Sequence, residues 1–342
     1  MRTSTKRRRL NLALQGGGAH GAFTWGVLDR LLEDSEIDFG WISGTSAGAF
    51  NAVALAHGLS HGHSRGHFHG LAPAALDGGD EDFRTAAREA LNSLWHSVEK
   101  ARVPDLISLN PFLSTMARST TFSGAFSPYS FNPLGFDPLR KILNQTIDFE
   151  AIRRNENINV VIAATDVATG RPRMFQREEI TVDTVLASAC LPTLHHAVEI
   201  GGRMFWDGGF SANPDLLTIA RASPVEDTLL VLLNPIETGA TPRTAAAIED
   251  RVNTITFNQP LLRDIAVIVA AQRRTPPSWW RRLSGKGRNE RLGRHRFHMI
   301  EAAHYTAEME AKTKVTPNPE VLQYLHRAGR SEATAWLASN RS

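Results

Sequence analysis

The sequence predicts an α/β fold, a three-layer sandwich in which helices cover both faces of a mainly parallel central sheet. Near the N-terminus, a short apolar run is followed by a tight glycine-containing turn and then by residues with helical spacing, and the same plan occurs again directly afterwards. Further along, residues 159–167 and 227–235 are continuous apolar runs, typical of parallel strands that are buried on both faces.

The composition is that of an ordinary globular protein. Of the 342 residues, 42% are hydrophobic and 21% are charged, which provides enough apolar surface for a sizeable core. The net charge of +3 gives no reason to expect a nucleic-acid partner, and the single cysteine, Cys190, excludes an internal disulfide. No apolar stretch approaches the roughly 20 residues that span a bilayer, and the basic N-terminus lacks a secretory signal. We therefore expect a cytoplasmic protein, at most peripheral on a membrane.

The first of the two units centres on three consecutive glycines. Alternating leucines at 10–14 predict a short strand, and apolar residues at helical spacing over 23–32 predict a helix. Gly16, Gly17 and Gly18 lie between them, and holding three glycines rigid costs chain entropy. The turn therefore needs bare backbone amides, which would face either a dinucleotide phosphate or the oxyanion of an acyl-transfer intermediate.

The second unit contains a G-x-S-x-G sequence, from Gly44 to Gly48, between a predicted strand and a predicted helix. In a nucleophile elbow, glycines flank the serine because the turn is tight, and the turn projects the hydroxyl outward. The alternative is a chance turn of small residues in which Ser46 is an ordinary helix cap. The strand-turn-helix context favours Ser46 as a nucleophile.

The elbow also bears on the glycines at 16–21, which match the dinucleotide pattern G-x-G-x-x-G. That pattern requires an acidic residue about 20 positions on, at the end of the second strand. Here the second predicted strand ends in Ile42-Ser43 and leads directly into the turn at Ser46. The sequence therefore favours an oxyanion hole over a dinucleotide site.

A nucleophilic serine needs a base, and the sequence offers two kinds. Asp207 follows Phe205-Trp206, and in a partly dry site its pKa would be raised so that it could accept the serine proton. Alternatively, Asp207 is only the turn residue after a predicted hairpin over 198–206. Histidine is the other candidate base, with His195 or His196 the best placed.

Three motifs in order, at residues 16–21, 44–48 and 207–209, resemble those of the patatin-like phospholipase family. The segment 187–209 is similar to the one that leads to the family's catalytic aspartate. Members are serine acyl hydrolases that use a Ser–Asp dyad rather than a triad. The resemblance covers residues 10–215, as a catalytic domain, and 216–342 resembles a C-terminal extension of some bacterial members, which we expect to pack on the same domain.

The resemblance assigns a role to individual residues. It implies Ser46 as nucleophile and Asp207 as base, with no metal and no organic cofactor. The implied oxyanion hole is Gly16, Gly17 and Gly18, and the implied motif-supporting glycines are Gly21, Gly44, Gly48, Gly208 and Gly209. Many members carry Arg or Lys where this chain has His20, so a fixed positive charge is missing at this position unless His20 is protonated.

The expected function is that of a carboxylic ester hydrolase of lipid metabolism, with a lipid or another acyl ester as its partner. Two alternatives remain open, a nucleotide-binding oxidoreductase and a non-catalytic lipid-binding protein. Phospholipids, lysophospholipids, neutral glycerides, thioesters and polyester are all compatible with the sequence, which specifies neither the acyl ester nor the oligomeric state.

Three segments depart from the α/β pattern. Residues 1–9 are a basic tail, and 57–80 are rich in His and Gly. We expect a flexible surface insert at 57–80 rather than a metal site, because no carboxylate or cysteine completes a recognisable ligand set. Residues 110–138, rich in Pro, Ser, Gly and Phe, suit an irregular loop that either lines a substrate pocket or packs on the domain.

The segment 273–296 generates a prediction about membranes. It is dense in arginine, Glu290 is its sole acid, and Trp279 and Trp280 are adjacent. Tryptophan rings suit a lipid interface, and each nearby cation adds about 1 kcal/mol on an anionic surface. Replacing both tryptophans with Ala should weaken sedimentation with anionic vesicles and leave soluble-ester hydrolysis intact. Unchanged vesicle binding would indicate a solvated loop whose tryptophans pack on the domain.

Overall fold

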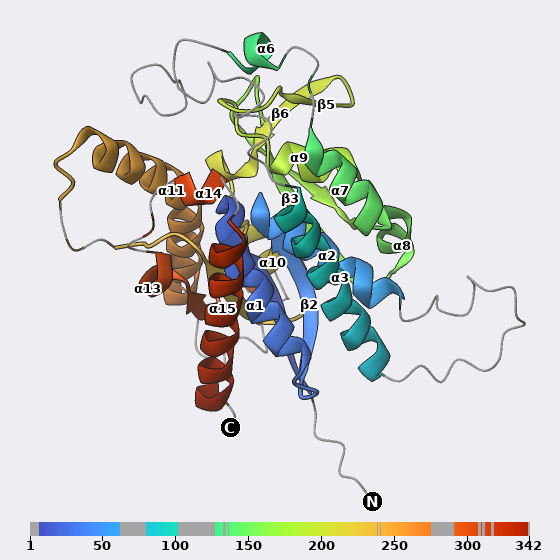
Figure 1. Ribbon diagram of the computed structural model, residues 1–342. Helices are drawn as coiled ribbons and strands as arrows, with labels where there is room; N and C mark the ends of the chain where they lie inside the picture. The colour runs from blue at the N-terminus through green and yellow to red at the C-terminus, as the bar shows by residue number, and fades with distance from the viewer. Residues whose placement is uncertain are drawn as a thin grey trace, which may run out of the picture.

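A central sheet organises the molecule (Figure 1). The computed structural model describes residues 7–61, 80–101, 127–132, 135, 137–237, 239, 241–274, 291–306, 309, 312–315 and 318–340. Within them the sheet has eight strands in the order β5-β6-β3-β2-β1-β7-β8, with β4 also paired to β3. Most of the basic tail, the His-rich insert and the loop over 110–138 lie outside the described residues. So do residues 275–290 of the segment 273–296, which contain Trp279 and Trp280.

The strands form a mainly parallel sheet with an antiparallel edge. The parallel strands are β1 (Arg8–Leu14), β2 (Ile37–Gly44), β3 (Asn159–Asp166), β7 (Asp227–Leu232) and β8 (Arg296–Glu301). The strands that enter antiparallel are β4 (Pro172–Gln176), β5 (Val198–Ile200) and β6 (Arg203–Asp207).

The helices connect and cover these strands. They are α1 (Gly21–Leu32), α2 (Ala47–His61), α3 (Asp80–Lys100), α6 (Pro128–Phe131), α7 (Pro138–Thr146), α8 (Phe149–Arg154), α9 (Val182–Ser188), α10 (Leu217–Ala222), α11 (Ala245–Arg274), α13 (Ala303–Thr306), α14 (Lys312–Val315) and α15 (Pro319–Asn340). Short 3₁₀ turns are η1 (Gly18–His20), η2 (Arg177–Glu179) and η3 (Gly208–Phe210).

The side chains of the central strands separate into two apolar clusters, one on each face of the sheet. In β7, Leu229 and Val231 pack in the cluster that includes α1, α2, α3 and α15, whereas Leu230 and Leu232 pack in the cluster that includes α10 and α11. Successive strand residues point to opposite faces, so one continuous apolar run supplies both layers. The predicted α/β three-layer sandwich is confirmed.

Two predicted local features are also present. The apolar runs beginning at Asn159 and Asp227 are the buried parallel strands β3 and β7. β5 and β6 pair as an antiparallel hairpin, and Gly201 (φ 58°) and Gly202 (φ 74°) at its turn adopt the left-handed conformation that favours glycine. This hairpin carries Asp207 back to the sheet, where Asp207 pairs with Ala164 of β3.

The C-terminal part of the chain shares the sheet and the core with the N-terminal part. β7 pairs in parallel with β1, and α15 packs along α1. The two helices approach closely at Gly26 and Gly329, where an added Cβ would lie 1.9 Å from the carbonyl oxygen of His326 and 2.1 Å from that of Phe23, respectively.

The crossing of α1 and α15 predicts a stability effect. Because backbone rather than a flexible side chain fills the space, Gly329→Ala should lower the free energy of unfolding by about 2 kcal/mol or more. Urea denaturation of the purified variant measures the loss. Gly239→Ala is the control, because a Cβ there meets no atom within 4 Å. Equal stability of the two variants would contradict the proposed close packing.

Candidate active site

The carboxyl ends of β1 and β2 place the two glycine-containing turns side by side. The strands pair in parallel, with Leu14 opposite Gly44, and the Thr45 amide donates to the Leu14 carbonyl (3.3 Å). A Cβ on Gly16 would lie 2.8 Å from the Ser46 Cβ. The first glycine of the loop is therefore required for the two turns to approach each other.

Ser46 lies on a strained turn between β2 and α2. Its φ of 52° makes it the one non-glycine residue with positive φ in the described part of the chain. This conformation costs roughly 1–2 kcal/mol for an L-residue, so the surrounding contacts must hold it. The Ser46 amide donates to Ser188 Oγ (2.9 Å). A Cβ added to Gly48 would lie 2.0 Å from the Leu14 carbonyl oxygen, and one added to Gly44 would lie 2.5 Å from the Gly48 carbonyl oxygen. The arrangement is that of a nucleophile elbow.

Backbone contacts fix Asp207 beside this serine. Its amide donates to the Cys190 carbonyl (2.8 Å), and its own carbonyl accepts from Thr165 Oγ1 (2.7 Å). Its Oδ1 accepts the Gly209 amide (2.7 Å), and the Ser46 side chain lies close enough to the carboxyl group to lower its pKa. The structure thus brings together Ser46 and Asp207, which are far apart in the sequence.

Burial controls the proton affinity of Asp207. The residue is 1% exposed, and the loss of hydration raises its pKa from 3.8 to about 7. The hydrogen bond from Gly209 and the nearby Ser46 side chain favour the ionised form and oppose part of this rise. A carboxylate with a pKa near 7 is ionised in a large fraction of molecules at neutral pH and is also basic enough to accept a proton.

Two more motif glycines are packed tightly around the aspartate. A Cβ on Gly208 would lie 2.2 Å from the Ala163 carbonyl oxygen, and one on Gly209 would lie 2.2 Å from the Phe257 ring of α11. Gly21 is similarly confined, since its Cβ would lie 2.7 Å from that of Ala47. Side chains at these positions would displace the strand ends that hold the two turns.

The three glycines of the first turn differ in their hydrogen bonding. The Gly16 amide donates to Asn213 Oδ1 (2.7 Å), so it is already occupied. The amides of Gly17 and Gly18 meet no acceptor among the described residues, and both glycines are partly exposed. Gly18 has a φ of 58°. Gly17 and Gly18 are therefore the available donors, whereas Gly16 shapes the loop.

Three amide side chains that the sequence analysis missed support the loop. Gln15 Oε1 accepts the amides of Leu233 (2.7 Å) and Asn234 (2.9 Å), which ties the ends of β1 and β7 together. Asn234 Nδ2 donates to the Gly16 carbonyl (3.3 Å). Asn213 and Asn234 both precede proline and follow a predicted strand or motif, and this is the one sequence signal that could have indicated them.

His20 does not supply a positive charge at neutral pH. It is buried, and its Nε2 is hydrogen-bonded with Thr313 Oγ1 (2.7 Å). Burial, and then the nearby charge of Lys314, lower the pKa of His20 to about 4. Neutral imidazole therefore holds α14 against the glycine turn.

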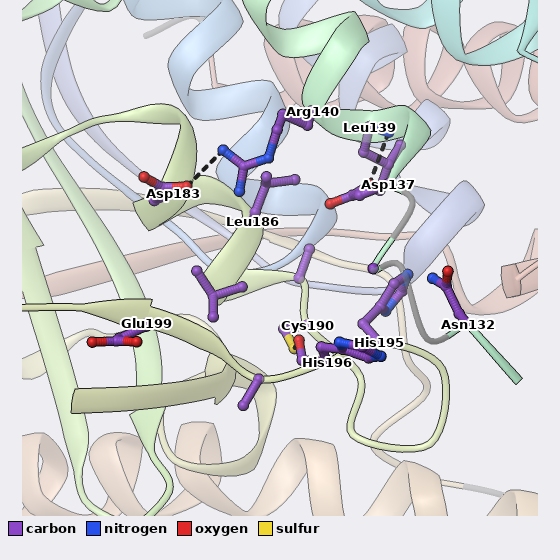
Figure 2. Close-up of a pocket in the computed structure, with 14 residues that line it drawn as sticks. Asn132, Asp137, Leu139, Arg140, Asp183, Leu186, Cys190, His195, His196 and Glu199 are labelled. Carbon is purple, nitrogen blue, oxygen red and sulfur yellow. Dashed lines mark hydrogen bonds and ion pairs between the residues drawn. The ribbon is translucent and has the colours of Figure 1, made fainter. Parts of the chain in front are cut away.

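His195 and His196 lie at a neighbouring cavity of about 250 Å³, where Figure 2 shows them beside Cys190. His196 Nε2 is 3.2 Å from the Pro128 carbonyl oxygen, and its ring stacks on Tyr129. In the described part of the structure, neither imidazole hydrogen-bonds to the serine or the aspartate, and neither of those residues lines the cavity. Burial raises the Cys190 thiol pKa to about 12.

Among the described residues, no group of three or more His, Cys, Asp or Glu side chains is arranged to hold a metal ion. Of the helices within the described ranges, none is both long and apolar enough to cross a membrane.

Together, the fold and the site define an α/β protein with a serine elbow and a buried aspartate at the carboxyl edge of a parallel sheet. A family model described as patatin-like phospholipase matches residues 12–220, and the chain belongs to this family. Among solved structures, VipD from Legionella pneumophila is 14% identical, with a TM-score of 0.43, and the match covers 96% of this chain and 67% of that one. At this level the likeness carries no argument about function. No curated protein matches the chain.

The burial of Asp207 predicts a pH-dependent stability. The pKa of Asp207 in the folded protein, about 7, exceeds its ordinary value of 3.8. The contribution of its protonated form to the free energy of unfolding is therefore fully present below pH 4 and is lost as the pH rises through 7. Asp207→Asn removes this loss. The stability of the variant relative to the wild type should therefore rise between pH 4 and pH 7, by up to about 4 kcal/mol for about three pKa units.

Urea unfolding at a series of pH values measures this difference. Asp82→Asn on α3 is the control, because residue 82 is exposed. A difference between wild type and Asp207→Asn that does not change with pH would contradict the raised pKa.

Proposed function

We propose that this protein is a serine acyl hydrolase that cleaves lipid or other acyl esters through a Ser46–Asp207 dyad. The observation that carries the proposal is the placement of the elbow serine next to a buried carboxyl group, whose pKa burial raises to about 7 and the serine side chain partly lowers. Membership of the patatin-like phospholipase family supports an acyl ester of a lipid as the substrate class.

In the acylation step, Asp207 accepts the Ser46 proton while Oγ forms a bond to the ester carbonyl carbon. The carbonyl π electrons move onto oxygen and form a tetrahedral oxyanion. As the oxyanion collapses, the bond to the leaving alcohol breaks, and protonated Asp207 donates its proton to that oxygen. The products of this step are the free alcohol and an acyl-enzyme on Ser46.

Deacylation repeats the sequence with water. Asp207 accepts a proton from a water molecule as its oxygen attacks the acyl carbon. Collapse of the second oxyanion breaks the bond to Ser46 Oγ, which takes the proton back from Asp207. The carboxylic acid leaves, and the serine and the aspartate return to their starting protonation states.

The Gly17 and Gly18 amides are proposed to bind both oxyanions. Their lack of another acceptor in the described residues supports this role, and each such donor is worth about 3 kcal/mol of transition-state stabilisation. The first turn of α2 begins directly after Ser46, so the helix dipole adds positive potential at the same place.

Labelling and hydrolysis by purified protein test this function. Ser46→Ala should abolish hydrolysis of a short p-nitrophenyl ester and labelling by a fluorophosphonate, with an unchanged circular dichroism spectrum. Asp207→Asn should lower turnover by roughly 100-fold or more, because it removes the proton acceptor but keeps the side-chain shape. Fluorophosphonate labelling of another serine in Ser46→Ala would contradict the assignment.

His195→Gln and His196→Gln are the matched controls for the base. Both substitutions should have modest effects on turnover. A loss of turnover as large as that of Asp207→Asn would indicate a catalytic triad instead of a dyad. A wild-type protein that neither hydrolyses esters nor labels, yet binds lipid, would be the non-catalytic alternative. Cofactor absorbance in the purified protein would instead indicate an oxidoreductase. A panel of acyl esters then identifies the substrate.

A further inference from the structure

A lysine from the C-terminal part of the chain lies behind the glycine turn. The short helix α14 packs directly on η1, so closely that a Cβ on Gly18 would be 2.1 Å from the Lys314 carbonyl oxygen. Thr313 on the same helix is hydrogen-bonded with His20, as described above. These two contacts place the Lys314 backbone against the candidate oxyanion loop.

Hydrogen bonds connect the Lys314 ammonium to that loop. Its Nζ donates to Asn234 Oδ1 (2.9 Å), and the Nδ2 of the same amide donates to the Gly16 carbonyl oxygen (3.3 Å). The carbonyl of Gly16 and the amide of Gly17 belong to one peptide unit. A donor that polarises this carbonyl therefore makes the Gly17 N–H more positive.

We infer that Lys314 is a positioning residue of the oxyanion site, whose ammonium acts through Asn234 to strengthen the Gly17 amide as a donor to the oxyanion. The inference rests on the proposed function. Hydrogen bonds with an ionised partner are roughly twice as strong as neutral ones, and linked hydrogen bonds polarise one another. The effect is largest in the transition state, when the carbonyl oxygen becomes negative.

The surroundings of Lys314 support an electrostatic role. The side chain is half-buried, and within the described residues no carboxylate lies within ion-pair distance of its ammonium. Burial lowers its pKa, and the more distant Asp250 of α11 opposes that shift. Its charge also lowers the pKa of His20 in η1, so its field reaches the loop. His20 is neutral at neutral pH, and among the described residues Lys314 is a cation that acts on this turn.

The first test separates charge from packing. Lys314→Met keeps the length of the side chain and removes the charge. It should lower kcat for a soluble p-nitrophenyl ester about 10-fold, less than the 100-fold or more that follows loss of a direct oxyanion donor, with KM within about twofold of wild type. Lys314→Arg should recover most of the loss. Lys141→Met, at an exposed position of α7, is the matched control and should retain wild-type kcat.

A double-mutant cycle tests the path through Asn234. If the ammonium acts through this amide, Lys314→Met should have little further effect once Asn234 is changed to Ala, and the two losses in kcat should not multiply. Losses that multiply would show that the two residues act independently and would overturn the relay.

The pH profile provides a readout that a purely structural lysine would not change. On the alkaline side, wild-type kcat should fall as Lys314 loses its proton, and in Lys314→Arg the fall should move to higher pH. His20 of η1 and Asp250 of α11 face the ammonium. Asp250→Asn should move the fall to lower pH, because the carboxylate raises the lysine pKa, and His20→Gln should leave it in place.

The outcomes distinguish this inference from the proposed function. An active wild type whose Lys314→Met variant keeps its kcat would overturn the inference and leave the proposed function standing. A variant with a lower melting temperature, altered KM and no recovery in Lys314→Arg would show a packing role and also overturn it. A wild type that shows neither hydrolysis nor Ser46 labelling would overturn the proposed function itself.

Discussion

The parallel pairing of β1 with β2 is the constraint on which the site depends. Because both strands run in the same direction, both of their carboxyl ends lie at one edge of the sheet, with Leu14 opposite Gly44. The turns that follow are then only a few ångströms apart, and backbone fills the space that a side chain at Gly48 would occupy. This geometry explains why glycine is found in both turns and why Ser46, between Gly44 and Gly48 in the second turn, has a strained backbone.

The candidate base depends on the opposite strand direction. β6 runs antiparallel to β3 and pairs only with its last three residues, Ala164 to Asp166. Asp207, at the end of β6, lies opposite Ala164 and therefore near the same edge of the sheet as the two turns. Its backbone is fixed by β-sheet pairing and by bonds to Cys190 and Thr165, which leaves the carboxyl group in a dry position. The burial that raises its pKa also makes its ionised form destabilising, so basicity at neutral pH is obtained at some cost in stability.

The C-terminal region is part of the same structural unit as the site. β7 extends the sheet beyond β1, and its end positions Asn234 behind the glycine turn. α14 then covers that turn and carries Lys314. His20 in the glycine turn is neutral at neutral pH, whereas a cation from the other end of the chain, Lys314, lies close by. Charge at a given place in a fold is thus not tied to one position in the sequence.

The amino-acid sequence was sufficient to predict the alternation of strands and helices, the glycine turns, the hairpin that ends at Asp207 and the family. Each of these follows from local patterns, in which side-chain spacing and turn residues specify the element. The sequence did not reveal that the Gly16 amide donates to Asn213, whereas the amides of Gly17 and Gly18 meet no acceptor among the described residues. Nor did it reveal that Lys314 lies behind these glycines. These contacts join residues up to about 300 positions apart, and local patterns carry no information about which distant side chains meet.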